Sequence, residues 1–165
     1  MAKKNDFKPG DLVVYPCHGL GEITDIETRE FGGTELQLYV VEFKKEKMIL
    51  RVPVNKAATS GMRRVSTRDE MGKAVVALKG RARVKRTMWS RRAQEYEAKI
   101  NSGSPVSIAE VIRDLRRNTG QADQSYSERQ MYQAALDRLA REFAAIEKID
   151  EDAATDRLEK IMAAA

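Results

Sequence analysis

The apolar residues of this chain follow two different periods. Up to about residue 54 they alternate with polar residues or form short runs rich in β-branched and aromatic side chains, as in LVVYP (12–16) and TELQLYVVEF (34–43). Such patterns are typical of β-strands. From about residue 67 onward, apolar residues recur every three or four positions, which is typical of amphipathic helices. The two patterns predict a β region followed by an α region.

Turn residues separate the predicted strands of the first half. Two glycines within CHGLG (17–21) predict a tight corner, and Gly32-Gly33 predicts a hairpin between the strands on either side of it. The alternation slips between Ile23 and Ile26, which indicates irregular pairing of that strand. Strands that follow one another so closely predict neighbours in one antiparallel sheet.

The last predicted strand of this half is MILRVPV (48–54), which follows the charged turn KKEK (44–47). Because proline lacks the N–H that a central strand must donate, Pro53 predicts that this strand lies at a sheet edge or ends there. Short strands joined by short turns over about 50 residues predict a small β-barrel or a strongly bent antiparallel sheet.

Helix-start signals precede the apolar stripes of the second half. TRDE (67–70) and SYSE (125–128) match capping boxes, and Ser104-Pro105 offers an N-cap followed by a proline at the first helical position. A further helix is expected from near Thr87 to before Gly103. The expected apolar stripes include Met71, Ala74, Val75 and Leu78; Ile108, Val111, Ile112 and Leu115; Met131, Ala135, Leu139, Phe143 and Ile146; and Leu158, Ile161 and Met162.

The change of period predicts two domains, which we place at residues 1–58 and 59–165. Strands followed by helices without alternation indicate an α+β fold rather than βαβ units. A length of 165 residues suits two small domains. No apolar run approaches the roughly 18 residues that a membrane span needs. One cysteine and an N-terminus without an apolar core favour a cytoplasmic protein.

The residue types that catalysis and metal binding require are scarce. The only histidine, His18, directly follows the only cysteine, Cys17, and neighbours in a glycine-rich corner form a poor catalytic dyad. Structural zinc normally needs four Cys or His ligands. No glycine-rich phosphate motif is present. We therefore expect no catalytic residue, no metal and no cofactor, and we interpret the protein as a non-enzyme.

Positive charge is concentrated in the middle of the chain. Residues 67–120 carry 13 Lys and Arg against 6 Asp and Glu, whereas residues 121–165 carry 6 against 10. A local excess of this kind indicates a polyanion partner, although a solvated basic face has the same signature. Within it, KRTMWSRR (85–92) surrounds the only tryptophan, Trp89, with four cations: Lys85, Arg86, Arg91 and Arg92.

Two interpretations of Trp89 remain open from the residues alone. Trp89, Ala93, Tyr96 and Ile100 share one face of a helix, which favours a place in the core. Trp89 also stands in the first turn, where a side chain can project beyond the core and stack on or wedge between bases.

Four segments together resemble the CarD/CdnL family of bacterial transcription regulators. They are FKPGDLVVYPCHGLGEI (7–23), LRVPV (50–54), WSRR (89–92) and AEVIRDLRR (109–117), and they occur in the family's order over nearly the whole chain. The first segment is moderately specific, because transcription-repair coupling factors carry a similar module. Its combination with the later segments is highly specific.

The resemblance implies a Tudor-like β domain that binds the β subunit of RNA polymerase at its β1 lobe, through Arg29 and Arg51. It also implies a helical domain that contacts promoter DNA at the upstream edge of the transcription bubble. There Trp89 would wedge into the minor groove and prolong the open complex, with cations beside it on phosphates. The expected DNA contacts are Trp89, Lys85, Arg86, Arg91, Arg92 and, by a looser match, Arg129. We expect a monomer whose DNA binding is largely independent of sequence.

Two other functions remain possible from the sequence. The chain could be a protein-interaction adaptor in which Trp89 belongs to the core. It could also be a free-standing repressor, which would need a helix that reads base edges, usually in a symmetric dimer. No helix-turn-helix pattern is visible in the sequence.

Overall fold

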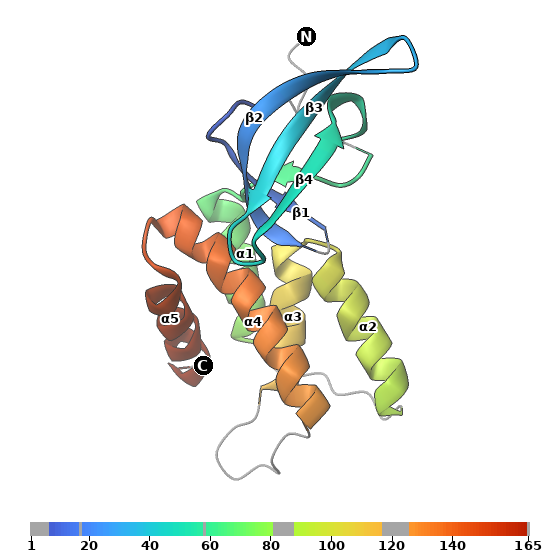
Figure 1. The fold of residues 1–165 in the computed structure, drawn as a ribbon. Coiled ribbons are helices and arrows are strands. Elements are labelled where there is room, and N and C mark those ends of the chain that lie inside the picture. The colour runs from blue at the N-terminus through green and yellow to red at the C-terminus, as the bar shows by residue number, and fades with distance from the viewer. Residues whose placement is uncertain (1–6, 17, 58, 81–87, 117–125, 165) are drawn as a thin grey trace. The chain divides into compact units, whose positions relative to one another are not determined.

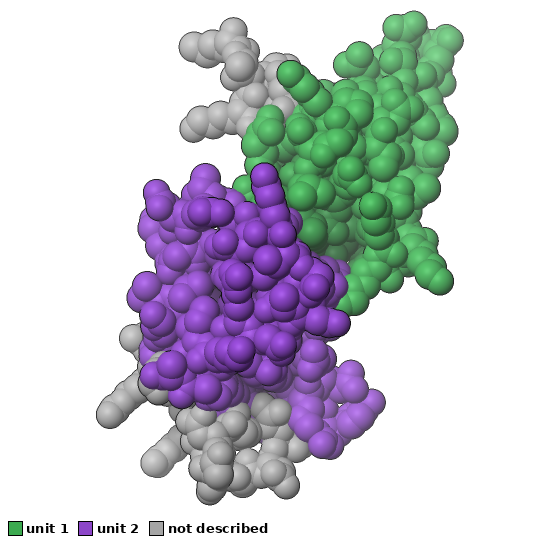
Figure 2. Space-filling model, turned by 90° about the vertical axis from the view of Figure 1, so that its left-hand side faces the viewer, with its two compact units in different colours: residues 1–65 green, residues 66–165 purple. Residues whose placement is uncertain are grey.

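The computed structural model describes residues 7–16, 18–57, 59–80, 88–116 and 126–164 (Figure 1). The chain forms two compact units, residues 1–65 and residues 66–165, which Figure 2 shows in separate colours. The expected α+β architecture is confirmed: strands make up the first unit and helices the second. The division falls after Val65, later than the boundary at residue 58 that the sequence suggested.

The first unit is a five-stranded antiparallel sheet with the strand order β4-β3-β2-β1-β5. The predicted edge position of the strand that ends at Pro53 is confirmed, because β4 is outermost. A short strand that the sequence did not reveal, β5, pairs with β1 and carries the first unit past residue 58. The strands are β1 (Leu12–Tyr15), β2 (Gly19–Phe31), β3 (Thr34–Phe43), β4 (Met48–Pro53) and β5 (Arg63–Arg64), with a 3-10 turn at Val54–Lys56.

Two predicted features of the sheet are confirmed, an irregular pairing and a hairpin turn. The pairing of β2 with β3 shifts between Ile23 and Asp25, within the stretch where the alternation slips. Gly32 and Gly33 turn the β2–β3 hairpin with φ angles of 56° and 84°, a region that glycine enters without steric cost. The shift at Ile23 keeps apolar residues on the core face on both sides of it. That face packs Phe7, Val13, Ile23, Tyr39, Val41, Phe43, Val52, Ala57 and Met62.

The second unit holds five α-helices within the described residues. The capping box at Thr67 is confirmed: Thr67 Oγ1 accepts from the Glu70 N–H at 3.2 Å, and Glu70 Oε1 accepts from the Thr67 N–H at 3.3 Å. Ser104 caps the helix that begins at Pro105, as predicted. The other predicted box includes Ser125, which lies outside the described residues. The helices are α1 (Arg68–Leu78), α2 (Trp89–Asn101), α3 (Pro105–Leu115), α4 (Tyr126–Glu147) and α5 (Glu151–Ala164).

Helix α3 is central to this unit and packs against α1, α2 and α4 (Figure 1). The described helices are each too short or too polar to span a bilayer. The residues named in the predicted apolar stripes, except Ile161, belong to the core or pack against it, and Ala74, Ile112, Leu136, Leu139 and Leu158 are almost completely buried there. Burial of these side chains is the main stabilising contribution, at roughly 25 cal/mol per Å² of apolar surface removed from water.

Candidate nucleic-acid interface and paired-arginine surface

Strand register brings Arg51 to the same face of the sheet as Glu27. Leu38 of β3 lies opposite Glu27 on one side and opposite Pro53 on the other. Side chains two residues apart in a strand point to the same face. Arg51 therefore shares the face of Pro53, Leu38 and Glu27, and Arg29 joins them because it follows Glu27 by two residues. This face is opposite to the core face of the sheet.

Glu27 binds both arginines. Its Oε2 atom lies 3.0 Å from Nε of Arg29 and 3.1 Å from Nε of Arg51. The hydrogen bond from Arg51, together with the positive charge of Arg29, holds the pKa of Glu27 below its ordinary value of 4.5. We call Glu27, Arg29 and Arg51 the paired-arginine surface. The arginine side chains remain 48% and 41% exposed, so both are accessible to a partner.

Two exposed apolar side chains lie on the same face as the paired-arginine surface. Phe31, two residues after Arg29, is 52% exposed, and Ile49, two residues before Arg51, is 55% exposed. Protein interfaces commonly combine such apolar contacts with arginine. Our reading of the sequence missed both residues, although the alternation of β2 and β4 places them there.

Trp89 opens helix α2 with its side chain partly buried against the helical core. The ring of Tyr96 lies 6.3 Å from the indole ring, and the guanidinium carbon of Arg92 lies 5.3 Å from it. Burial is the main cause that raises the pKa of Tyr96, so this phenol stays neutral around pH 7. Side chains of α2 itself, Tyr96 and Arg92, thus hold the indole in place at the N-terminal end of the helix.

The two arginines that follow Trp89 differ in their surroundings. Arg91 is exposed, whereas Arg92 is half-buried over the indole, and its Nε atom is buried without a hydrogen-bond partner in the described residues. Arg91 is therefore suited to a phosphate contact, and Arg92 also supports the tryptophan. The sequence alone gives no basis for distinguishing these two cations.

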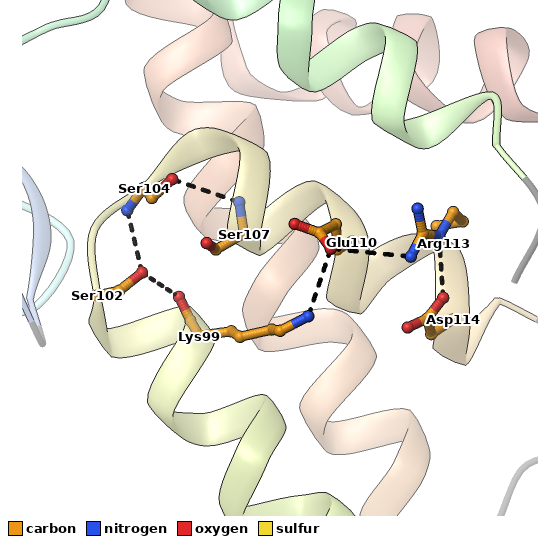
Figure 3. A network of polar contacts seen from close by, with 7 residues as sticks. All are labelled: Lys99, Ser102, Ser104, Ser107, Glu110, Arg113 and Asp114. Atoms are coloured by element: carbon orange, nitrogen blue, oxygen red, sulfur yellow. Dashed lines mark hydrogen bonds and ion pairs between the residues drawn. The ribbon is translucent and has the colours of Figure 1, made fainter. Parts of the chain in front are cut away.

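The C-terminal end of α2 is joined to α3 by a chain of polar contacts (Figure 3). Lys99 of α2 lies 3.4 Å from the Glu110 carboxylate of α3, which Arg113 approaches to 3.9 Å. In the connecting turn, Ser102 Oγ donates to the Lys99 carbonyl at 2.6 Å and accepts from the Ser104 N–H at 3.2 Å.

Helix α4 holds the same end of α2 through an arginine. Arg138 Nη1 donates to the Ile100 carbonyl and to Asn101 Oδ1, each at 3.2 Å. A cation is favourable at this end, since the helix dipole places partial negative charge there. These hydrogen bonds fix the C-terminal end of α2. The helix therefore holds Trp89, at its N-terminal end, in a defined position.

Arg129 lies exposed in the first turn of α4, three residues after Tyr126, which is 70% exposed. Figure 1 shows the first turns of α2 and α4 at the same end of the helical unit. Arg129 and Trp89 thus come from distant parts of the sequence to one end of this unit. Lys85 and Arg86 lie outside the described residues.

Comparison with known proteins gives the family. Residues 7–66 match the CarD-like/TRCF RID domain, and residues 73–159 match the C-terminal domain of CarD. This chain belongs to the CarD family. Both halves of the CarD pattern are present in the expected order, so the family resemblance of the sequence is confirmed. This CarD-family chain is a transcription-associated factor, and its first domain is of a type that points to interaction with RNA polymerase.

The chain is similar to a full-length relative and to two solved domains. It is 31% identical over 152 residues to the putative transcription factor YdeB of Bacillus subtilis, covering 88% of this chain and 95% of YdeB. The 72-residue N-terminal domain of Myxococcus xanthus CarD is 25% identical, covering 39% of this chain and 89% of that domain with a TM-score of 0.31. CdnLNt from Myxococcus xanthus is 34% identical, covering 39% and 92%, with a TM-score of 0.32.

Proposed function

We propose that this CarD-family chain binds the β subunit of RNA polymerase with its first unit and stabilises the open promoter complex with its second. The observation that carries the proposal is the position of Trp89. The indole is partly buried at the first residue of α2, with an exposed arginine two residues later. A flat apolar ring mounted at a helix end and flanked by cations suits a minor-groove wedge.

The paired-arginine surface supports the polymerase contact. Arginines whose side chains are already oriented lose less conformational entropy when they pair with a partner carboxylate. Glu27 orients Arg29 and Arg51 in this way, and exposed Phe31 and Ile49 supply apolar area on the same face. We assign this face to the β1 lobe of the β subunit, as the family resemblance implies.

The helical unit supplies the DNA contact. Arg91 and Arg129 are exposed and can neutralise phosphates, and Lys85 and Arg86 add charge to the same segment of sequence as Trp89. Binding through a few cations and one wedge is weak and largely independent of sequence. Attachment to polymerase compensates by raising the effective concentration of the helical unit at the upstream edge of the bubble. The chain acts as a monomer in this scheme, at the nucleoid, where the polymerase is.

The proposal is tested by co-purification with core RNA polymerase followed by measurement of open-complex lifetime. Trp89→Ala is expected to shorten the lifetime several-fold while polymerase binding stays unchanged, since stacking of an aromatic ring on bases contributes about 1–3 kcal/mol. Trp89→Phe keeps an aromatic wedge and is the matched control. A full lifetime with Trp89→Ala would remove the wedge role.

A second candidate function follows from the partial burial of Trp89. The indole packs against the helical core, as it would in a protein-interaction adaptor that does not touch DNA. The two functions differ in whether promoter DNA reaches the ring. An adaptor would bind polymerase and leave open-complex lifetime independent of residue 89.

A further inference from the structure

The most exposed large apolar side chain in the described part of the chain is Met88, next to Trp89. Met88 is 77% exposed, whereas Trp89 is partly buried and one side of its ring is approached by Arg92. A thioether side chain held in water at a helix end contributes nothing to the core. Its position beside the tryptophan instead suggests a contact made only in a complex.

Met88 also occupies a backbone position that favours a different residue. It is the N-cap of α2, and no side-chain hydrogen bond caps this helix. Ser, Thr, Asp and Asn are preferred at an N-cap because their side chains accept from the free N–H groups of the first turn. By contrast, Thr67 and Ser104 cap α1 and α3 in this way. The helix that carries Trp89 thus has an apolar tip where a polar cap would stabilise it more.

The backbone of Met88 is nevertheless held firmly. Its carbonyl accepts from the N–H groups of Arg91 and Arg92, each at 3.1 Å, which closes the first turn of α2. The flexible side chain of Met88 therefore projects from a fixed point, one residue before the indole. Exposed Arg91 adds positive charge in the same turn.

We infer that Met88 forms the leading part of a two-residue wedge with Trp89 and contacts a base step of promoter DNA. This inference rests on the proposed function. Duplex DNA provides the matching surface, since anionic phosphates flank a groove whose floor consists of base edges. Methionine is among the apolar side chains that insert between base steps from the minor groove. Its unbranched, polarisable chain adapts to irregular gaps beside the more rigid indole.

The test compares open-complex lifetimes of full-length variants on one promoter. Met88→Asn removes the apolar tip but improves the N-cap, so α2 is expected to be at least as stable. Met88→Leu keeps apolar volume. We expect Met88→Asn to shorten the lifetime about threefold or more and Met88→Leu to stay within about twofold, because burial of apolar surface supplies the contact. Thermal unfolding of each variant checks the helical unit.

The outcomes separate this inference from the proposed function. If Trp89→Ala shortens the lifetime and Met88→Asn does not, the role of Met88 is overturned and the proposed function stands. If neither variant shortens it, the proposed wedge itself is overturned. If Met88→Asn weakens binding to core polymerase, Met88 contacts protein instead of DNA, and the inference is wrong.

Photo-crosslinking supplies a second measurement. Met88→benzoylphenylalanine is expected to crosslink to labelled DNA at the upstream edge of the bubble within the open complex. The same photo-reactive residue at Val76, which is 68% exposed on α1 of the same unit, is the control and should give little crosslinking. Equal crosslinking from both positions would contradict a specific contact by Met88.

Discussion

Glu27 binds Arg51 across an intervening strand, with 3.1 Å between Glu27 Oε2 and Arg51 Nε although 24 residues separate them in the chain. Arg29 shares the same carboxylate oxygen. The three side chains form one cluster on the face of the sheet that lies away from its core. This arrangement makes the orientation of two candidate polymerase contacts depend on a residue that need not touch polymerase.

Reversing either arginine charge is expected to weaken polymerase binding. Arg29→Glu and Arg51→Glu each remove a cation from the paired-arginine surface and place a second carboxylate beside Glu27. Loss of one buried charged pair at an interface commonly costs about 2–5 kcal/mol. Binding to core polymerase, measured by fluorescence anisotropy with labelled chain, should therefore fall at least tenfold, since about 1.4 kcal/mol corresponds to a factor of ten.

Lys45→Glu is the matched control for these two variants. It changes the charge by the same amount in the exposed turn between β3 and β4. Polymerase binding should then change little beyond a general electrostatic effect on association. Normal binding by both arginine variants would move the contact surface elsewhere in the chain.

Glu27→Ala is expected to weaken polymerase binding less than either arginine reversal does. The variant keeps both cations but leaves them without their shared partner, so each must be ordered when the complex forms. An entropy cost of about 0.5–1.5 kcal/mol for each of the two side chains sums to about 1–3 kcal/mol, which predicts a loss of roughly fivefold to 150-fold. Tighter binding by Glu27→Ala would show that the carboxylate opposes the contact.

The ion pair between Glu27 and Arg51 predicts that the stability it contributes depends on pH. The pKa of Glu27 lies below 4.5, so the carboxylate is ionised in the folded chain at neutral pH. Because the folded-state pKa is lowered, the interaction is present above the ordinary value and is lost as the pH falls through the lowered one. The contribution of Glu27 should be constant from pH 8 to about pH 5. Titration of its side-chain carboxyl by NMR, compared with Arg51→Gln, checks this.

Trp89 fluorescence is expected to report DNA directly, because the chain contains one tryptophan. Partial burial beside Tyr96 predicts an emission between those of buried and fully exposed tryptophan. In the polymerase–promoter complex, stacking on a base should quench it, provided that the polymerase background is subtracted using the Trp89→Phe variant. Emission that promoter DNA does not alter would favour the adaptor.

Arg91 and Arg92 are expected to behave differently when each is changed to glutamine. In the proposed complex exposed Arg91 contacts phosphate, so Arg91→Gln should lower the slope of log affinity against log salt by about 1 on forked DNA. Arg92 lies half-buried over the indole, so Arg92→Gln should also destabilise the helical unit by roughly 0.5–2 kcal/mol, the range of cation–π pairs from exposed to desolvated sites. Equal effects of the two variants on thermal stability would contradict this division.

Gly21→Ala is expected to destabilise the sheet unit by about 1–3 kcal/mol, because overpacking forces neighbouring side chains out of place. A Cβ at Gly21 would lie 2.8 Å from side-chain atoms of both Phe43 and Val41. Gly72→Ala is the control: Gly72 lies in α1 with nothing within 4 Å of the added carbon. That change should stabilise the helical unit by roughly 0.5–1 kcal/mol, and chemical denaturation measures both.

Much of the fold could be predicted from local patterns. The hairpin at Gly32-Gly33, the slip after Ile23 and the capping box at Thr67 all depend on residues close in sequence. The predicted helical stripes also became the core, since a helix must bury its apolar face. β5 escaped prediction because two residues show no period, and the first unit therefore extends to Val65.

The sequence by itself determined the order of strands and helices, the apolar faces and the basic segment around Trp89, because each follows from short-range periodicity and composition. Only the tertiary structure decided which charges meet. Arg51 reaches Glu27 through the register of three strands, and Arg129 comes to the same end of the helical unit as Trp89 through helix packing. These pairings depend on contacts between residues far apart in the chain, for which a linear pattern carries no signal.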